Sequence, residues 1–251
     1  MYEAFFFGPE DRQLFGVYHP SLGADRRVLT LICPPLFSEL NRTHAALRKL
    51  GNSLASVGHH VLRFDYSGTG DSYGNLEEFT LADWQQDITT ALKEGCELSG
   101  CDKVRVLGVR GSCPLVARSV GNDPTVDRFV FWDPLVDGER YLEELRNGQQ
   151  ELFQQNVHVS SEAKQAARHS YVVYGMSDSM ESEFLNLTAE SYVPVQGKML
   201  RVVSTSATAK PAVADVSAEF VDFECAWGIE SEDLVMCQPV LEILMKQLSE
   251  R

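Results

Sequence analysis

Four consecutive residues, Gly108-Val109-Arg110-Gly111, have the pattern of a nucleophile elbow, but the central residue is not a nucleophile. In such an elbow a buried strand turns sharply into a helix, and small residues stand beside the central one because its backbone is strained. A serine or cysteine there would attack a carbonyl carbon. The guanidinium of Arg110 stays protonated and cannot attack. The position therefore predicts either an anchor for a carboxylate or phosphate, or a structural ion pair.

Two other side chains near the elbow are weaker catalytic candidates. Ser112 lies two residues further on, in the first turn of the following helix, where capping or packing competes with a role as nucleophile. His44 follows the first predicted parallel strand, so it could overlook the pocket and act as a base, or bond locally at a helix start. Cys113 lies in an apolar helix, where we expect a buried and inert thiol.

The rest of a Ser-His-Asp triad is missing from its usual places. The triad needs an acid after a later strand and a histidine after the last one. The expected acid position, residues 205–208, reads Thr-Ser-Ala-Thr and has no carboxylate. Residues 225–230, where the histidine should fall, read Cys-Ala-Trp-Gly-Ile-Glu, and no histidine follows His169. These absences predict a degenerate catalytic site.

The backbone part of such a site is expected to survive. One N–H donor would come from Gly111, directly after the elbow residue. The other would come from Leu36, in the loop after the first parallel strand, because the two prolines before it have no N–H. Two donors beside a guanidinium suit a bound carboxylate or phosphate.

Three carboxylates are expected at strand ends around Arg110. Asp133 ends the strand beside the elbow strand, and Glu39 and Asp65 follow two other strands. Any of the three could neutralise Arg110 or line a ligand pocket. A partly buried ion pair adds little net stability, but loss of one partner leaves an unpaired buried charge.

The elements that must position these residues alternate between strand and helix. Buried apolar runs predict parallel strands, and apolar residues at helical spacing predict the helices between them. Turn-forming residues between two apolar runs predict an antiparallel hairpin at the sheet edge over residues 2–18. Predicted strands cover residues 28–33, 60–66, 104–109, 127–132, 199–204 and 219–224, and predicted helices cover 43–57, 80–95 and 234–248. This order is typical of an α/β fold with a mostly parallel sheet flanked by helices.

Residues 137–196 interrupt that pattern. They are rich in Glu, Gln and Ser, contain no convincing buried strand and include a loose linker at residues 174–179. We interpret them as a small helical cap inserted over the carboxyl ends of the strands, within a single domain that covers residues 1–251.

The motifs resemble those of the α/β-hydrolase superfamily over essentially the whole chain. Residues 65–72, Asp-Tyr-Ser-Gly-Thr-Gly-Asp-Ser, are similar to the Asp-x-x-Gly-x-Gly-x-Ser turn of that superfamily. More narrowly, residues 33–44 (Cys-Pro-Pro-Leu-Phe-Ser-Glu-Leu-Asn-Arg-Thr-His), 62–72 and 108–111 resemble the hydrolase-like proteins found with exosortase systems, several of which also carry arginine at the elbow. The resemblance implies the α/β-hydrolase fold, ester or thioester hydrolysis as its usual chemistry, and a role beside a biosynthetic or surface-polymer pathway.

Composition argues against several classes of function. A formal net charge of -14 disfavours nucleic-acid binding and docking on an acidic membrane surface. No 18-residue apolar run or signal-peptide pattern occurs, so we expect a cytoplasmic protein. The six cysteines lack paired spacing, so neither a metal site nor a disulfide framework is predicted, and no cofactor is expected.

Three functions are consistent with the sequence. The first is a hydrolase-like protein with a degenerate triad, which binds an acyl- or carboxylate-bearing small molecule beneath the cap. The second is an active esterase or thioesterase with an unusual constellation, such as His44 with Ser112 or with a water molecule. The third is an interaction module whose cap docks a protein partner. Arg110 and the missing late histidine favour the first and third, whereas the intact elbow and residues 65–72 favour a retained pocket.

Overall fold

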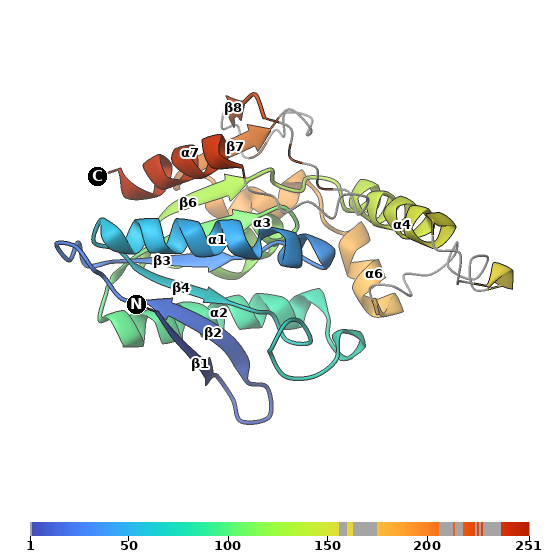
Figure 1. The fold of residues 1–251 in the computed structure, drawn as a ribbon, viewed down its shortest axis with the longest axis horizontal. Coiled ribbons are helices and arrows are strands. Elements are labelled where there is room, and N and C mark those ends of the chain that lie inside the picture. Colours follow the sequence, from blue (N-terminus) through green and yellow to red (C-terminus); the bar gives the residue numbers. More distant parts are fainter. Residues whose placement is uncertain are drawn as a thin grey trace.

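A computed structural model describes residues 2–155, 160–162, 175–205, 213, 218–223, 225, 227 and 237–250. They form an eight-stranded sheet with helices on both faces (Figure 1). The strands are β1 (Glu3–Phe7), β2 (Leu14–His19), β3 (Val28–Cys33), β4 (His60–Phe64), β5 (Lys103–Val109), β6 (Val126–Trp132), β7 (Met199–Thr205) and β8 (Ala218–Val221). The helices are α1 (Ser38–Ser56), α2 (Leu81–Ser99), α3 (Ser112–Val120), α4 (Gly138–Gln155), α6 (Asp178–Leu185) and α7 (Gln238–Ser249), with short 3-10 helices η1 (Leu76–Glu78) and η2 (Ala189–Val195).

The sheet places the elbow strand at its centre. The strand order is β1-β2-β4-β3-β5-β6-β7-β8, and each neighbouring pair from β4 to β8 is parallel. β1 and β2 form the predicted antiparallel hairpin, with β1 at the edge. Because parallel strands end at the same edge of a sheet, the residues that follow β3, β5 and β6 lie close together.

The sheet is buried on both faces, which explains its continuous apolar runs. The side chains of β5 point to both faces. Val104 and Val106 belong to the core that includes residues of α2 and α3, whereas Leu107 and Val109 belong to the core that includes residues of α1 and α7. The predicted α/β architecture, with helices on both sides of a mostly parallel sheet, is confirmed.

Three helix ends differ from the predicted ones. α1 starts before residue 43, because its polar first turn, which includes Glu39, is buried by contacts that the sequence pattern does not reveal. α2 extends beyond residue 95 and ends at Gly100, whose left-handed φ of 64° stops it. α7 starts later than residue 234, so that Pro239 lies in the first turn, where proline is tolerated.

The cap is helical, as predicted, and lies beside the carboxyl ends of the central strands (Figure 1). In the described part of the chain it consists of α4, α6 and η2. The predicted linker at 174–179 ends earlier, because Ser177 caps α6 and Asp178 is already helical. His158 and His169 lie outside the described residues.

Within the described ranges, no helix combines the length and the apolar content needed to cross a membrane. The same residues contain no group of three or more His, Cys, Asp or Glu side chains placed to hold a metal ion. All six cysteines are free thiols, and all but Cys96 are buried. Folding brings Cys225 and Cys237 together, with their Sγ atoms 2.8 Å apart, although their spacing in the sequence gives no hint of it.

The free energy of unfolding is expected to fall as the pH drops below about 6.5, because two histidines are buried in the neutral form. Burial, followed by nearby arginines, lowers the pKa of His19 and of His59 from 6.5 to about 4. Between these values the unfolded chain binds protons that the folded chain does not, so acid favours unfolding. We expect a loss of about 1–3 kcal/mol per histidine, measured by urea unfolding at about pH 7 and pH 5. In a His59→Gln protein, the free energy of unfolding should fall less steeply with decreasing pH. An equally steep fall would show that His59 does not contribute to the acid sensitivity.

Candidate functional site

The predicted elbow is present between β5 and α3. Arg110 has a φ of 53°, in the left-handed region that side chains rarely adopt, and α3 begins directly after Gly111. Gly111 is required by a close approach, because a Cβ there would lie 2.7 Å from Cδ1 of Leu36. A Cβ on Gly108 would lie 3.1 Å from the Cα of Cys113. Leu36 and Gly111, the two predicted backbone donors, are therefore neighbours.

The Arg110 guanidinium is buried and paired with two carboxylates. Its Nε lies 3.1 Å from Oε1 of Glu39, and its Nη2 lies 3.0 Å from Oε2 of Glu144. Tyr141 donates its hydroxyl to the other oxygen of Glu39 at 3.2 Å. The ring centres of Tyr141 and Trp227 lie 5.7 and 5.3 Å from the guanidinium carbon. Glu39 was one of three predicted partners for Arg110, and Glu144 is a second partner, contributed by the cap helix α4.

The two carboxylates keep Arg110 charged. Burial alone would lower its pKa, but the charge of Glu39, followed by Tyr141 and Glu144, outweighs burial and raises the pKa above its usual value. Side-chain exposure is 8% for Arg110 and 3% for Glu39, against 46% for Glu144. Glu39 is therefore the inner, desolvated partner, and Glu144 is the partner on the solvent side.

Asp133, at the end of β6, accepts hydrogen bonds from two later segments of the chain. Its Oδ1 accepts from the backbone N–H of Thr205 at 2.8 Å, and its Oδ2 accepts from the Thr205 hydroxyl at 2.9 Å. The same Oδ2 accepts from the indole Nε1–H of Trp227 at 2.8 Å. Asp133 is fully buried and has a left-handed φ of 46°. The carboxylate thus fixes the indole whose ring faces Arg110.

Ser112 is held inside the core by two hydrogen bonds. Its hydroxyl donates to the carbonyl oxygen of Pro34 and accepts from the Tyr66 hydroxyl, whose oxygen lies 3.0 Å away. Cys113 is buried beside it, and burial raises the pKa of that thiol well above its usual value. These contacts match the packing role considered for Ser112 and the inert thiol expected for Cys113.

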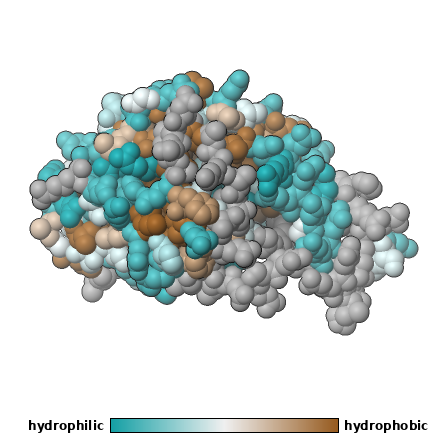
Figure 2. All heavy atoms as spheres, turned by 90° about the horizontal axis from the view of Figure 1, so that it is seen from above, coloured by the Kyte–Doolittle hydropathy of each residue, from teal (hydrophilic) through white to brown (hydrophobic). Residues whose placement is uncertain are grey.

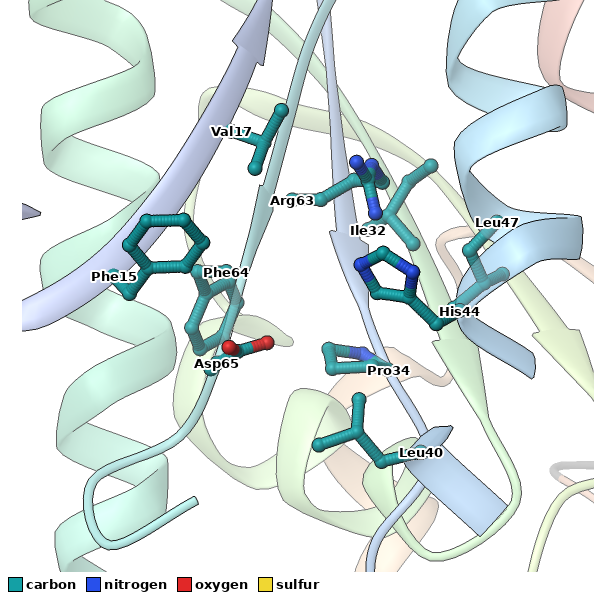
Figure 3. Close-up of a pocket in the computed structure, with 10 residues that line it drawn as sticks. All are labelled: Phe15, Val17, Ile32, Pro34, Leu40, His44, Leu47, Arg63, Phe64 and Asp65. Carbon is teal, nitrogen blue, oxygen red and sulfur yellow. The ribbon is translucent and has the colours of Figure 1, made fainter. Parts of the chain in front are cut away.

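His44 and Asp65 lie elsewhere, in a pocket between α1 and the end of β4 (Figure 3). Burial, followed by the charge of Arg63, lowers the pKa of His44. Asp65 holds the turn that follows it: its Oδ2 accepts from the Asp71 N–H at 3.2 Å, and its carbonyl accepts from the Ser72 hydroxyl at 2.6 Å. The lining of this pocket includes neither Arg110 nor Ser112, so it does not join the two predicted catalytic residues.

Three contributors to the elbow site were not predicted from the sequence: Tyr141, Glu144 and Trp227. A signal existed only for Trp227, which falls in the segment where a late histidine was sought and not found. The other two belong to α4, and the sequence does not indicate how that helix docks on the sheet.

The sheet, its flanking helices and the elbow define an α/β-hydrolase fold. No protein-family model matches the chain. Among solved structures, alpha/beta hydrolase domain-containing protein 10 from mouse is similar over 97% of this chain and 96% of its own, with a TM-score of 0.61 and 19% identity. A thioesterase domain from the curacin biosynthetic pathway is similar over 99% of both chains, with a TM-score of 0.59 and 12% identity. At these identities the likeness shows the fold.

A short stretch is also similar in sequence to curated proteins. Palmitoyl-protein thioesterase ABHD10, mitochondrial, from Bos taurus is 40% identical over 67 residues, which are 27% of this chain and 21% of that protein. The protein of the same name from Mus musculus is 48% identical over 42 residues, 17% of this chain and 14% of its own length. The matched stretch therefore spans about a fifth or less of each relative.

Proposed function

We propose that this protein is a non-hydrolytic α/β-hydrolase-fold protein that binds an acyl- or carboxylate-bearing small molecule beneath its cap. One observation carries the proposal: Arg110 stands at the elbow, and Trp227, held by Asp133, stands between that acid and the elbow residue. In a Ser-His-Asp hydrolase the corresponding places hold the nucleophile and the base. A guanidinium has no lone pair to attack with, and an indole N–H donates but does not accept a proton.

The solvent-side contact of Arg110 supports a role as ligand anchor. Glu144 is about half exposed and is also shared with Arg140, at 3.2 Å. Exposed ion pairs contribute little, typically less than about 1 kcal/mol. An incoming carboxylate can therefore replace Glu144 on Nη2, while the buried Glu39 stays on Nε. The anchor and ion-pair interpretations are then two aspects of one site.

The surroundings of Arg110 suit an acyl chain beside a carboxylate. Phe184 of the cap helix α6 lies against Tyr141 and Phe37, with ring centres 5.7 and 5.8 Å apart. This aromatic contact joins the cap to the loop that carries Leu36. If the cap moves away when Glu144 is displaced, the exposed surface is apolar, as an acyl chain requires.

The second candidate is an active thioesterase. The names of the curated relatives favour it, since each matched protein is called a palmitoyl-protein thioesterase. Three expectations from the sequence stay predictions: a closer relation to exosortase-associated proteins, a cytoplasmic location, and a protein partner at the cap.

Hydrolysis assays separate the two candidates. We expect no turnover of p-nitrophenyl esters or acyl thioesters above the buffer rate, and the same result for Ser112→Ala and His44→Ala proteins. Turnover that disappears in either variant would establish a relocated catalytic centre and overturn the non-hydrolytic proposal.

Calorimetric titration with hexanoate tests the anchor. We expect binding to tighten by up to about fivefold in Glu144→Gln, because the internal competitor loses its charge. Binding should be lost in the Arg110→Met/Glu39→Leu double variant, which removes the anchor without leaving a buried charge. Equal affinity in all three proteins would place the hexanoate elsewhere.

A further inference from the structure

The pocket between α1 and the end of β4 contains a buried cation that the elbow site does not use. Arg63, on β4, is 7% exposed and lines this pocket together with His44 and Asp65 (Figure 3). The remaining walls are mainly apolar and include Leu40, Leu47 and Phe64 of the adjacent elements. The empty space measures about 350 Å³, but part of this is open solvent at the mouth, so the enclosed part suits a small occupant.

The one hydrogen bond of the Arg63 side chain in the described structure does not neutralise its charge. Its Nε donates to Nε2 of His19 at 3.2 Å. The other ring nitrogen of His19 lies 3.0 Å from the amide oxygen of Asn52, which can only accept, so Nδ1 carries the proton and Nε2 is the acceptor. His19 is thus a neutral imidazole, consistent with burial, followed by the charge of Arg63, lowering its pKa to about 4.

No carboxylate forms an ion pair with Arg63 among the described residues, and its two terminal nitrogens have no hydrogen-bond partner there. Asp65 faces the same pocket and its charge acts on Arg63, but the two side chains form no ion pair, and Oδ2 of Asp65 accepts from the N–H of Asp71. Burial lowers the pKa of Arg63 to about 10, so it is still a cation at neutral pH. Arg110 and Arg12, by contrast, each have two carboxylate partners. A buried charge is costly unless an anion compensates it.

We propose that this pocket binds the carboxylate of a small monocarboxylic acid, held by the free terminal nitrogens of Arg63 with His44 at the rim. One negative charge would form the ion pair that the Arg63 guanidinium lacks among the described residues. A dianion such as phosphate would meet the carboxylate of Asp65 in the same pocket, which disfavours it. The short apolar part of the acid contacts the walls formed by Leu40, Leu47 and Phe64. This site is separate from the Arg110 anchor and does not depend on it.

Thermal unfolding with acetate, propionate and butyrate tests the proposal, with sodium chloride at matched ionic strength as reference. We expect the acids to raise the melting temperature by a few degrees at concentrations well above the dissociation constant. Arg63→Met should weaken binding at least tenfold, whereas Arg118→Met, which removes an exposed arginine of α3, should leave it unchanged. Because Arg63→Met removes an uncompensated buried charge, the variant should fold at least as stably as the parent without ligand.

The histidine NMR signals provide a second measurement. The imidazole signals of His44, assigned with a His44→Gln protein, should shift with propionate in the parent and in the Arg110→Met/Glu39→Leu protein, but not in Arg63→Met or Arg63→Gln. An equal rise in melting temperature with chloride, or undiminished binding in the Arg63 variants, would overturn the proposal. Loss of the shift in the Arg110→Met/Glu39→Leu protein, with the shift kept in the Arg63 variants, would assign the acid to the elbow site instead.

Discussion

Replacement of Glu39 by glutamine is expected to reduce the free energy of unfolding by about 3–5 kcal/mol. The substitution leaves the guanidinium of Arg110 buried with only the half-exposed Glu144 as its anionic partner. The amide keeps the shape of the side chain and its oxygen, so the loss measures the charge and not the packing. Urea unfolding at neutral pH gives the number directly.

Two further variants show whether the loss belongs to the pair. Glu144→Gln removes the outer carboxylate of the same guanidinium and should cost less than about 1 kcal/mol, because that pair is exposed to solvent. In the Arg110→Met/Glu39→Leu protein both charges are gone, and the stability should return to that of the parent or exceed it. A Glu39→Gln protein as stable as Glu144→Gln would show that Arg110 needs no buried partner.

Replacement of Asp133 by alanine should also be severe, with an expected loss of about 3 kcal/mol or more in the free energy of unfolding. Among the described residues, the carboxylate accepts from buried donors of Thr205, its N–H and its hydroxyl, and from the indole N–H of Trp227. Each donor left without an acceptor costs about 1–3 kcal/mol. Indole fluorescence, followed during urea unfolding, would in addition show whether Trp227 leaves its place against Trp132, whose ring centre is 5.1 Å away.

Trp227→Phe is the matched control for Asp133→Ala. It removes only the indole donor and keeps an aromatic ring, so the expected loss is about 1–3 kcal/mol. If Asp133→Ala and Trp227→Phe reduced the free energy of unfolding equally, the hydrogen bonds from Thr205 to Asp133 would contribute nothing to stability.

The fold was predictable because its signals are local. An apolar run, a glycine, a central residue and a second glycine are enough to indicate the elbow, and Arg110 does adopt the strained backbone that this pattern implies. Helix ends were less predictable where a tertiary contact decides them. The first turn of α1 is polar, so its sequence does not predict a buried helix. It is buried because Glu39 pairs with Arg110.

The partners within the site were not predictable, because they depend on contacts between distant segments. Glu39 and Arg110 are separated by 71 residues, and Asp133 and Trp227 by 94. The sequence supplied a set of candidate carboxylates but no means of choosing between them. The sequence around Arg63 is that of an ordinary strand, and its burial beside Leu40, His44 and Leu47 of α1 becomes visible only in the folded chain.

The arrangement around Arg110 has a consequence for the evolution of this chain. Arg110→Ser alone would leave Glu39 buried without its cationic partner, and the site would still contain no base. Trp227→His alone would place an imidazole beside the Arg110 cation. Each of these two single steps is therefore expected to give a protein that is less stable and still lacks part of a triad. On the non-hydrolytic function proposed above, the paired side chains around Arg110 would thus oppose a stepwise return to a Ser-His-Asp site.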